Sequence, residues 1–289
     1  MTVVIAGCGD LGTEAGLRFA AAGHRVLGLR RRPELLPSAI EGRRIDLARD
    51  IPEIPADTDI VVLALTPDTR SVDGYRHAYL DAPAHLLAAL EQAGARPRRI
   101  LLVSSTSVWG DIDDGRVLDE SSPVAPRPGT GEIVYAGECL VRLRAPDAIV
   151  LRLSGLYGPG RGRLLRQVRD GVAHSGPDRY TNRIHRDDAA AIVHLTSAVA
   201  EPRRLYLGSD CEPAVRSDVA EFLAAQRGVL PADAGTPSVD ESAQHDGRTP
   251  LAGKQLTNAR LRESGFRFAY PTYREGYAHL LSAEGARHP

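Results

Sequence analysis

The sequence predicts an α/β protein with a doubly wound parallel sheet and a smaller C-terminal region. Three observations predict this fold. An apolar strand at the start runs into a G-x-G-x-x-G turn, further apolar strands alternate with helical segments, and a Gly- and Pro-rich loop follows a late strand. The 289 residues, 43% of them hydrophobic, are enough to bury one large core or two smaller ones.

The first unit of the sheet is a strand, a helix and a second strand in direct succession. Residues 3–6 are apolar throughout, residues 14–22 have the apolar spacing of a helix with Gly23 at its end, and residues 24–29 have the pattern of a strand. This order predicts a βαβ unit, in which a tight turn joins the first strand to the helix.

That turn carries three glycines whose spacing suits a dinucleotide. Gly7 allows the tight turn, Gly9 lets the backbone approach a pyrophosphate, and Gly12 lets the helix pack close to the strand. The helix N-terminus then presents unpaired N–H groups and the positive end of its dipole to an anion. We therefore predict a dinucleotide site; the alternative is a merely tight turn.

The residues after the second strand bear on which dinucleotide is bound. An acidic side chain there accepts hydrogen bonds from the ribose hydroxyls of NAD, whereas arginine pairs with the 2′-phosphate of NADP. The chain has Arg30, Arg31 and Arg32 at this place, so NADP is the predicted cofactor, with NAD as the second choice. The other interpretation is a solvated basic loop.

Composition argues against several other classes of protein. The net charge of -1, from 36 basic and 37 acidic residues, creates no field that would attract nucleic acid. Cys8, Cys139 and Cys211 are isolated, so we expect small packed thiols rather than disulfides or metal ligands. No stretch reaches membrane-spanning length and no signal peptide precedes the first strand, which predicts a cytoplasmic protein with no membrane partner.

Further strands and helices alternate along the chain. We expect buried parallel strands at residues 59–65, 100–103, 149–153 and 204–207, and helices at residues 75–93 and 187–200. Three prolines mark a loop at residues 123–128, and a second loop, residues 157–162, follows the strand at 149–153. Ligands gather at the carboxyl ends of such strands, so the second loop lies where a ligand is expected.

Four segments of the chain occur in the order found in a known family. They are residues 7–12 (GCGDLG), 104–110 (SSTSVWG), 152–160 (RLSGLYGPG) and 184–188 (IHRDD). With these segments the chain resembles the extended short-chain dehydrogenases/reductases, in particular the NAD-dependent epimerase/dehydratase group. The resemblance covers most of the chain and implies a Rossmann-type doubly wound sheet with a smaller C-terminal substrate-binding region.

The resemblance also implies a catalytic set, of which this chain keeps one member. In the family a Ser or Thr after the fifth strand orients the substrate oxygen and a Tyr shuttles the proton. A Lys four residues after the Tyr lowers its pKa and holds the nicotinamide ribose. Ser105 matches the Ser; the other interpretation is a loop hydroxyl that bonds its own backbone.

The Tyr and the Lys of this set are missing. The family pattern Y-x-x-x-K-x-x-x-E, aligned on Glu138, puts Thr130 at the Tyr position and Val134 at the Lys position. If Tyr135 is aligned with the Tyr instead, Cys139 stands in place of the Lys. Valine donates no hydrogen bond and a threonine hydroxyl is a very weak acid, so we expect an atypical member of the family.

Other side chains are candidates for the missing chemistry. Tyr157 is a candidate acid near the nicotinamide, although packing is the favoured role. His185 titrates near neutral pH, but it precedes a helix that Asp187 or Asp188 would cap, so a structural role is again favoured. Asp46, in the segment 45–47 at the end of a short third strand, matches the family position that touches the adenine; an ordinary turn residue is the alternative.

The predicted site combines these positions with their neighbours. The catalytic candidates are Ser105, Tyr157 and Thr130, and no metal site is predicted. The predicted cofactor contacts are Gly7, Gly9, Asp10, Leu11, Gly12, Arg30, Arg31, Arg32, Asp46, Leu47, Leu65 and Thr66.

We expect two domains. Residues 1–153 with 181–207 form the dinucleotide-binding domain, and residues 154–180 with 208–289 form a substrate-binding cap. In this second region Arg161, Arg163 and Arg166 are candidate clamps for an anionic substrate, the alternative being that they are solvated. Residues 228–250 are expected to be a mobile loop.

Three functions are compatible with the sequence. The first is an NADP-dependent oxidoreductase or epimerase of a small carbonyl or sugar-like substrate. The second is a binding protein without turnover, whose NADP occupancy a partner reads. The third is an isomerase or dehydratase that retains its nicotinamide through each cycle. The expected partner is a small-molecule substrate, and by analogy with relatives the chain is expected to form homodimers.

Overall fold

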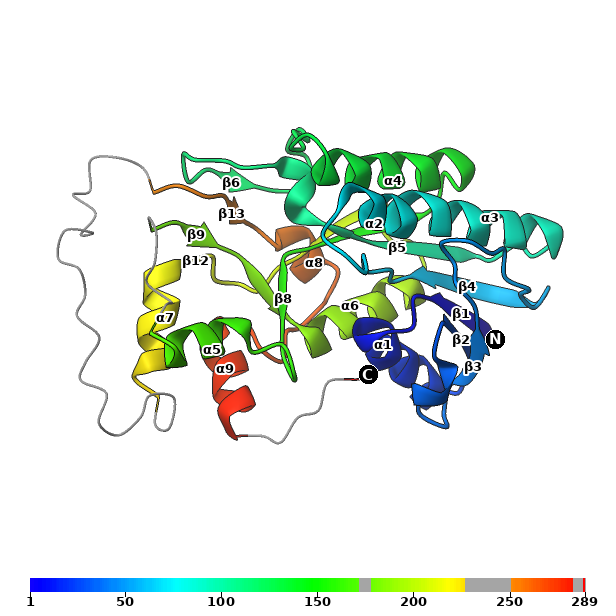
Figure 1. Ribbon diagram of the computed structural model, residues 1–289, viewed down its shortest axis with the longest axis horizontal. Helices are drawn as coiled ribbons and strands as arrows, with labels where there is room; N and C mark the ends of the chain where they lie inside the picture. The colour runs from blue at the N-terminus through cyan, green and yellow to red at the C-terminus, as the bar shows by residue number, and fades with distance from the viewer. Residues whose placement is uncertain (172–177, 227–250, 283–287, 289) are drawn as a thin grey trace.

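The centre of the protein is a seven-stranded sheet in the order β11-β7-β5-β4-β1-β2-β3, with every neighbouring pair parallel (Figure 1). The structure is a computed structural model that describes residues 1–171, 178–226, 251–282 and 288. Its strands are β1 (Thr2–Ala6), β2 (Arg25–Arg30), β3 (Glu41–Arg44), β4 (Thr58–Leu63), β5 (Arg99–Ser105), β7 (Ile149–Leu153) and β11 (Leu205–Gly208). This order is that of a Rossmann-type doubly wound sheet, as predicted.

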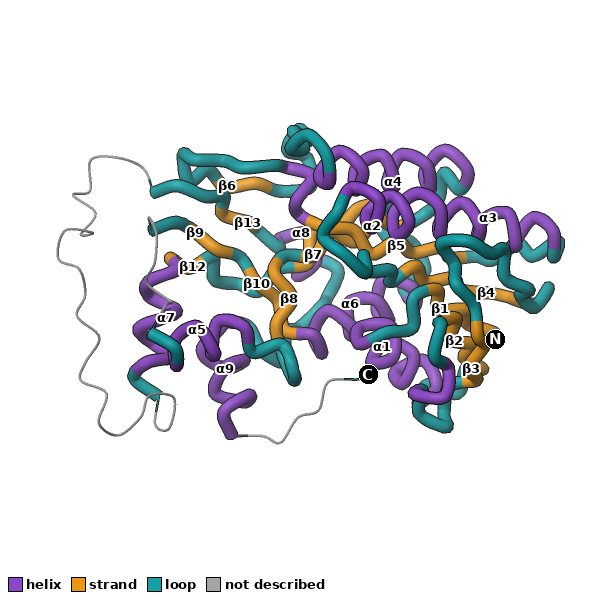
Figure 2. Tube along the Cα trace, viewed as in Figure 1, coloured by secondary structure: helices purple, strands orange, loops and turns teal. Residues whose placement is uncertain are grey.

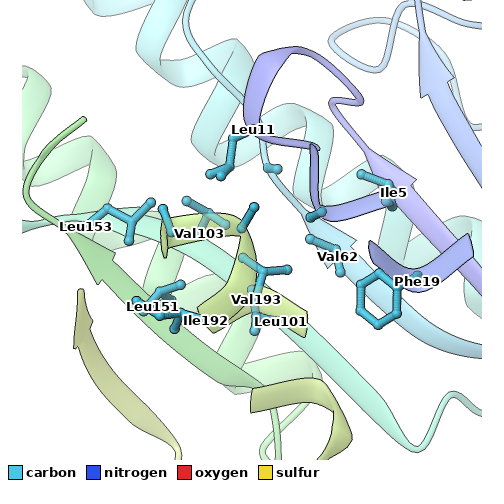
Figure 3. Close-up of a cluster of buried hydrophobic side chains, with 14 of the residues drawn as sticks. Ile5, Leu11, Phe19, Val62, Leu101, Val103, Leu151, Leu153, Ile192 and Val193 are labelled. Carbon is cyan, nitrogen blue, oxygen red and sulfur yellow. The ribbon is translucent and has the colours of Figure 1, made fainter. Parts of the chain in front are cut away.

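Helices cover both faces of the sheet because successive strand residues point to opposite sides. Ile5 packs with α1 (Asp10–Ala21) and α6 (Arg186–Ala198), and Figure 3 shows it in one cluster with side chains such as Phe19 and Val193. Val4 packs on the other face with α3 (Ala82–Gln92) and α4 (Thr130–Arg144). The near-continuous apolar runs of the strands follow from burial on both faces.

The remaining elements gather at the end of the sheet where β5 and β7 finish (Figures 1 and 2). Three two-stranded sheets join them: β8 with β10, β9 with β12, and β6 with β13. Their bounds are β6 (Val117–Leu118), β8 (Gly155–Tyr157), β9 (Tyr180–Thr181), β10 (Arg183–His185), β12 (Ala214–Val215) and β13 (Gln255–Leu256). The helices here are α5 (Arg163–Arg169), α7 (Arg216–Ala224), α8 (Ala259–Glu263) and α9 (Tyr273–Ser282).

Two segments differ from the sequence-based expectation. The helix expected at residues 75–93 is three elements, α2 (Val72–Arg76), a π-helical turn (His77–Asp81) and α3. Pro83 lies in the first turn of α3 and has no N–H to donate backward, which accounts for the wider turn before it. The third strand ends at Arg44, so Asp46 follows that strand instead of ending it.

Other expectations have mixed outcomes. Cys8 is buried, and burial raises the pKa of its thiol to about 11, whereas Cys139 and Cys211 are exposed, so the prediction of packed thiols was wrong for these two. Residues 228–250, expected to be a mobile loop, lie outside the described residues. In the described parts of the chain, no helix combines the length and the apolar character needed to cross a membrane.

Candidate functional site

The glycine loop, residues 7–12, joins β1 to α1 next to the point where the strand order of the sheet reverses. Gly7 has a φ of +79°, and a Cβ there would lie 2.8 Å from the carbonyl oxygen of Ala64. A Cβ on Gly12 would lie 2.7 Å from the carbonyl oxygen of Gly7. The fold itself therefore requires glycine at both positions.

Gly9 is different, because no contact among the described residues requires a glycine there. Its φ is −90°, and a Cβ would find its nearest neighbour, the carbonyl oxygen of Gly7, 4.0 Å away. Gly9 is also the N-cap residue of α1 and provides no side-chain cap, so N–H groups of the first helical turn remain for an anion. The bare backbone at Gly9 fits the close approach of a pyrophosphate.

Arg30 lies at the end of β2 beside the glycine loop. The amides of Gly7 and Cys8 both donate to the carbonyl oxygen of Leu29, each at 3.2 Å, which ties the loop to the end of this strand. One terminal nitrogen of the Arg30 guanidinium, Nη1, is buried without a hydrogen-bond partner in the described structure. A buried cationic donor without a partner is unfavourable in the free protein and is suited to an incoming anion.

The other two arginines of the run have different surroundings. Arg31 makes a bidentate ion pair with Asp68, with both nitrogen–oxygen distances at 2.6 Å, at the exposed surface. Arg32 is exposed. A 2′-phosphate that paired with Arg31 would have to displace Asp68, so Arg30 is the arginine best placed for this role.

The predicted adenine side of the site is assembled from two loops. The amide of Ile45 donates to the carbonyl oxygen of Arg30 at 3.1 Å, which brings Asp46 next to the end of β2. Asp46 accepts a hydrogen bond from the amide of Ala48 at 3.2 Å, as an ordinary turn residue does. Leu47 is buried in the core; Leu65 and Thr66 follow β4, with Leu65 partly buried and Thr66 exposed.

Asp10 and Leu11, predicted to contact the cofactor, point their side chains into the protein. The carboxylate of Asp10, buried at the start of α1, makes ion pairs with Arg161 at 2.5 Å and with Arg186 at 3.2 Å. Leu11 is also in the first turn of α1, and its side chain is buried in the core (Figure 3). Any contact of these two residues with a dinucleotide is therefore left to their backbone N–H groups.

Ser105, at the end of β5, has the local geometry of the structural alternative. Its hydroxyl accepts a hydrogen bond from the amide of Ser107 at 3.1 Å and caps the 3-10 turn Thr106–Trp109. A hydroxyl that accepts from one partner still has a proton to donate, so this bond leaves Ser105 able to contact a substrate oxygen.

Thr130 and Val134, which the alignment on Glu138 places at the Tyr and Lys positions of the family, both lie in α4. Val134 is fully buried among apolar side chains, and Thr130 is the first residue of the helix. Glu138 is also fully buried, where it accepts from Arg152 at 2.7 and 3.0 Å and from the hydroxyl of Ser104 at 2.6 Å. The ion pair joins α4 to β7, and the hydrogen bond from Ser104 joins it to β5.

Tyr157 and His185 lie in the interior between β8, β10 and α9. The Tyr157 ring lies 4.8 Å from that of Tyr277 and 5.3 Å from that of His185, and burial raises the pKa of its hydroxyl well above the usual range. Burial lowers the pKa of His185 to about 4. The geometry of both side chains is that of packing.

The helix cap and the arginine cluster also differ from expectation. The ring of His185 itself caps α6 by accepting from the amide of Asp187 at 3.2 Å, while Asp188 accepts from two backbone amides before α9.

Arg161 pairs with Asp10, but Arg163 and Arg166 are exposed on α5. The three arginines are therefore not gathered into one clamp.

Sequence reasoning missed Lys254. Its ammonium group donates to the carbonyl oxygens of Thr106 at 2.8 Å and Gly110 at 2.9 Å, directly after Ser105, and it lines a cavity of about 210 Å³. A second cavity of about 740 Å³ shares Asp111 and Ile112 with the first. One signal was available, because Lys254 is the only lysine in the chain.

Comparisons with known proteins agree with this architecture. No family model matches the chain, and no curated protein matches it. A structure assigned as an NAD-dependent epimerase/dehydratase from Methylobacillus flagellatus is 33% identical with a TM-score of 0.77, over 97% of each chain. A functionally unknown conserved protein from Silicibacter pomeroyi is 25% identical with a TM-score of 0.70, over 97% of this chain and 98% of the other.

MoeE5, solved with UDP-glucuronic acid and NAD, is 22% identical with a TM-score of 0.74, over 96% of each chain. At this identity the similarity bears on the fold. The sheet order and the glycine loop define a Rossmann-type α/β protein of the extended short-chain dehydrogenase/reductase class. With the similarity to the Methylobacillus structure, the chain belongs to the NAD-dependent epimerase/dehydratase family.

Proposed function

We propose that the protein is a nicotinamide-dinucleotide-dependent enzyme, an oxidoreductase or epimerase of a small carbonyl or sugar-nucleotide-like substrate. The observation that carries this proposal is the glycine loop. Gly7 and Gly12 are required by the fold, whereas the space at Gly9 is left open beside a helix N-terminus. When bound, the nicotinamide would accept or supply hydride, and the chain would hold its pyrophosphate at this loop.

We further propose that NADP is preferred over NAD. Arg30 supports this preference, because its unpartnered buried nitrogen lies at the end of β2, where the family places the adenosine ribose. Relatives such as MoeE5 are solved with NAD, which supports a nicotinamide dinucleotide in general and keeps NAD as the second choice.

The substrate would bind over the carboxyl ends of β5 and β7. We propose that residues 154–180 and 208–289 form the cap of a two-domain protein, since α5, α7 and α9 share a hydrophobic cluster of their own. MoeE5 is solved with UDP-glucuronic acid and with UDP-glucose, which supports a sugar-nucleotide-like substrate. Ser105 would orient the substrate oxygen, and the reaction would proceed without the usual Tyr–Lys pair.

A second function is favoured by one observation. Val134, at the position where the family has its lysine, is completely buried among apolar side chains. A protein that binds NADP without turnover would need no replacement for that lysine. Binding of dinucleotide without exchange of hydride with any sugar nucleotide would support this second function.

Calorimetric titration of the cofactor-stripped protein with NADPH and NADH tests the proposal. We expect both to bind, with NADPH at least tenfold tighter, since a charge-assisted hydrogen bond contributes about 1.5–3 kcal/mol. Equal affinities would refute the NADP preference. If neither dinucleotide binds, the proposed function is wrong.

A further inference from the structure

Lys254 differs in residue type from every other lysine or arginine position of the chain. The protein has 36 basic residues, and this is the only one that is lysine. A guanidinium group remains protonated in proteins, whereas an amine can release a proton and take it back. Lys254 is therefore the one basic side chain besides histidine that can exchange a proton.

The backbone holds Lys254 in a fixed place. Gly253 before it has a φ of +90°, and a Cβ there would lie 2.5 Å from the carbonyl oxygen of Tyr180. The side-chain amide of Asn182 donates to the carbonyl oxygen of Lys254 at 2.7 Å, and Gln255 continues into β13, which pairs with β6. This segment directs the lysine side chain toward the loop that follows β5.

Among the described residues, the ammonium group has hydrogen-bond partners for two of its three N–H bonds. Two of its three N–H bonds are taken up by the carbonyl oxygens of Thr106 and Gly110, and the side chain lines the cavity of about 210 Å³. If the third proton leaves, the remaining two still bond the same oxygens, and the lone pair takes the position of the lost proton. The geometry thus orients one exchangeable proton without requiring the side chain to move.

The charges around Lys254 leave both protonation states accessible. The pKa of its amine is lowered to about 8, mainly by burial; Asp111 opposes this shift, and Arg179, which lines the same cavity, adds to it. Asp111 is itself ion-paired with Arg127, which weakens its influence. A group that titrates near the operating pH is suited to general acid–base catalysis.

We propose that Lys254 is a catalytic residue, which contacts the reacting oxygen of the substrate in this cavity and transfers its proton. This inference rests on the proposed function and replaces the missing Tyr–Lys pair with a group from the C-terminal region. In the reductive direction one Nζ–H bond breaks, an O–H bond forms on the substrate, and the bonding electrons stay on the amine. A dinucleotide held at the glycine loop would supply the hydride that the substrate carbon accepts, and oxidation would reverse each step.

Nuclear magnetic resonance can observe Lys254 directly. Lysine labelled with ¹⁵N at Nζ and incorporated biosynthetically gives a single side-chain signal, because the chain has one lysine. We expect this signal to titrate near pH 8 and to shift when UDP-glucuronic acid is added to the NADP-loaded protein. A signal that titrates near 10.4, the ordinary value for lysine, or that millimolar UDP-glucuronic acid and UDP-glucose leave unmoved, would overturn the proposal.

Two variants separate proton transfer from support of the loop. Lys254→Arg keeps a positive charge that cannot be released, and Lys254→Met removes the charge. We expect both to lose at least a hundredfold in the rate of hydride exchange between NADP and UDP-glucuronic acid, measured by isotope incorporation, with the affinity for the dinucleotide unchanged. Arg204→Met, which removes an exposed cation paired with Asp147, is the matched control and should keep the wild-type rate.

The outcomes distinguish this inference from the proposed function. If wild-type protein binds no dinucleotide, the proposed function fails. If it binds dinucleotide and Lys254→Arg exchanges hydride at the wild-type rate, Lys254 is only a support for the loop and the inference fails alone. Should Lys254→Met not fold, the arginine variant and the signal of the wild-type lysine still decide.

Discussion

The contrast between Gly9 and Gly12 leads to a test that separates binding from folding. Replacing Gly9 with valine places a bulky side chain where the pyrophosphate is expected, whereas replacing Gly12 with alanine adds one methyl group against the loop itself. A Cβ has its nearest neighbour at 4.0 Å at position 9 and at 2.7 Å at position 12. The larger substitution should therefore be the milder one for folding.

The magnitudes follow from these distances and from the backbone conformation. Gly9 has a φ of −90° and a ψ of −150°, at the border of the extended region and outside the left-handed conformation that favours glycine. Loss of glycine's freedom in the unfolded chain stabilises by about 0.4–1 kcal/mol, and a poorer N-cap offsets a similar amount. We expect Gly9→Val to change the free energy of unfolding by less than about 1 kcal/mol, and Gly12→Ala to cost about 1–3 kcal/mol.

Binding should show the reverse order of effects. We expect Gly9→Val to weaken NADPH binding at least a hundredfold, about 2.7 kcal/mol, because the valine side chain occupies the path of the phosphates. Chemical denaturation gives the stability of each variant, and calorimetry gives the affinity. If Gly9→Val binds NADPH as the wild type does, or is destabilised as much as Gly12→Ala, the assignment of Gly9 to the ligand is wrong.

Three further predictions concern charged groups. Arg30→Met should weaken NADPH binding by about 1.5–3 kcal/mol and leave NADH nearly unchanged in calorimetry, and equal losses would refute its pairing with the 2′-phosphate. Glu138→Ala should cost about 3–5 kcal/mol in denaturant unfolding, because Arg152 is left buried and unpaired; a loss below 1 kcal/mol would contradict this. Burial raises the pKa of Asp210 from 3.8 to about 7, so the folded state holds a proton that the unfolded chain releases between these values, and stability falls as pH rises through this window. Asp210→Asn should flatten that fall in melting temperatures measured from pH 4 to 8; an unchanged slope would show that Asp210 does not titrate there.

The sequence predicts the central sheet well because its signals are local. The apolar runs at the strands, the helical spacing after Gly12 and the glycine turn each depend on neighbouring residues, so β1, α1 and β2 lie where expected. The π-helical turn that interrupts the expected helix before Pro83 depends on a single missing N–H and on the packing around it. The periodicity of apolar residues along the sequence does not show either of these.

The site is less accessible to sequence reasoning because its contacts join distant residues. Asp68 engages Arg31 across two loops, and the partners of Asp10 lie more than 150 positions away along the chain. Lys254 reaches the loop after β5 from the far end of the sequence. Spacing along the chain gives no information about such pairs. The count of one lysine singles out Lys254 as unusual, but it does not show which residues Lys254 contacts.

The ion pairs of Asp10 have a consequence for communication across the molecule. This carboxylate stands in the first turn of the helix that faces the predicted pyrophosphate, and Arg161 and Arg186 compensate its charge from the segments that follow β8 and β10. A displacement of either arginine would expose the pyrophosphate to the repulsion of Asp10, so dinucleotide affinity depends on where those segments lie. By thermodynamic reciprocity, a dinucleotide bound at the proposed site would hold the same segments in place.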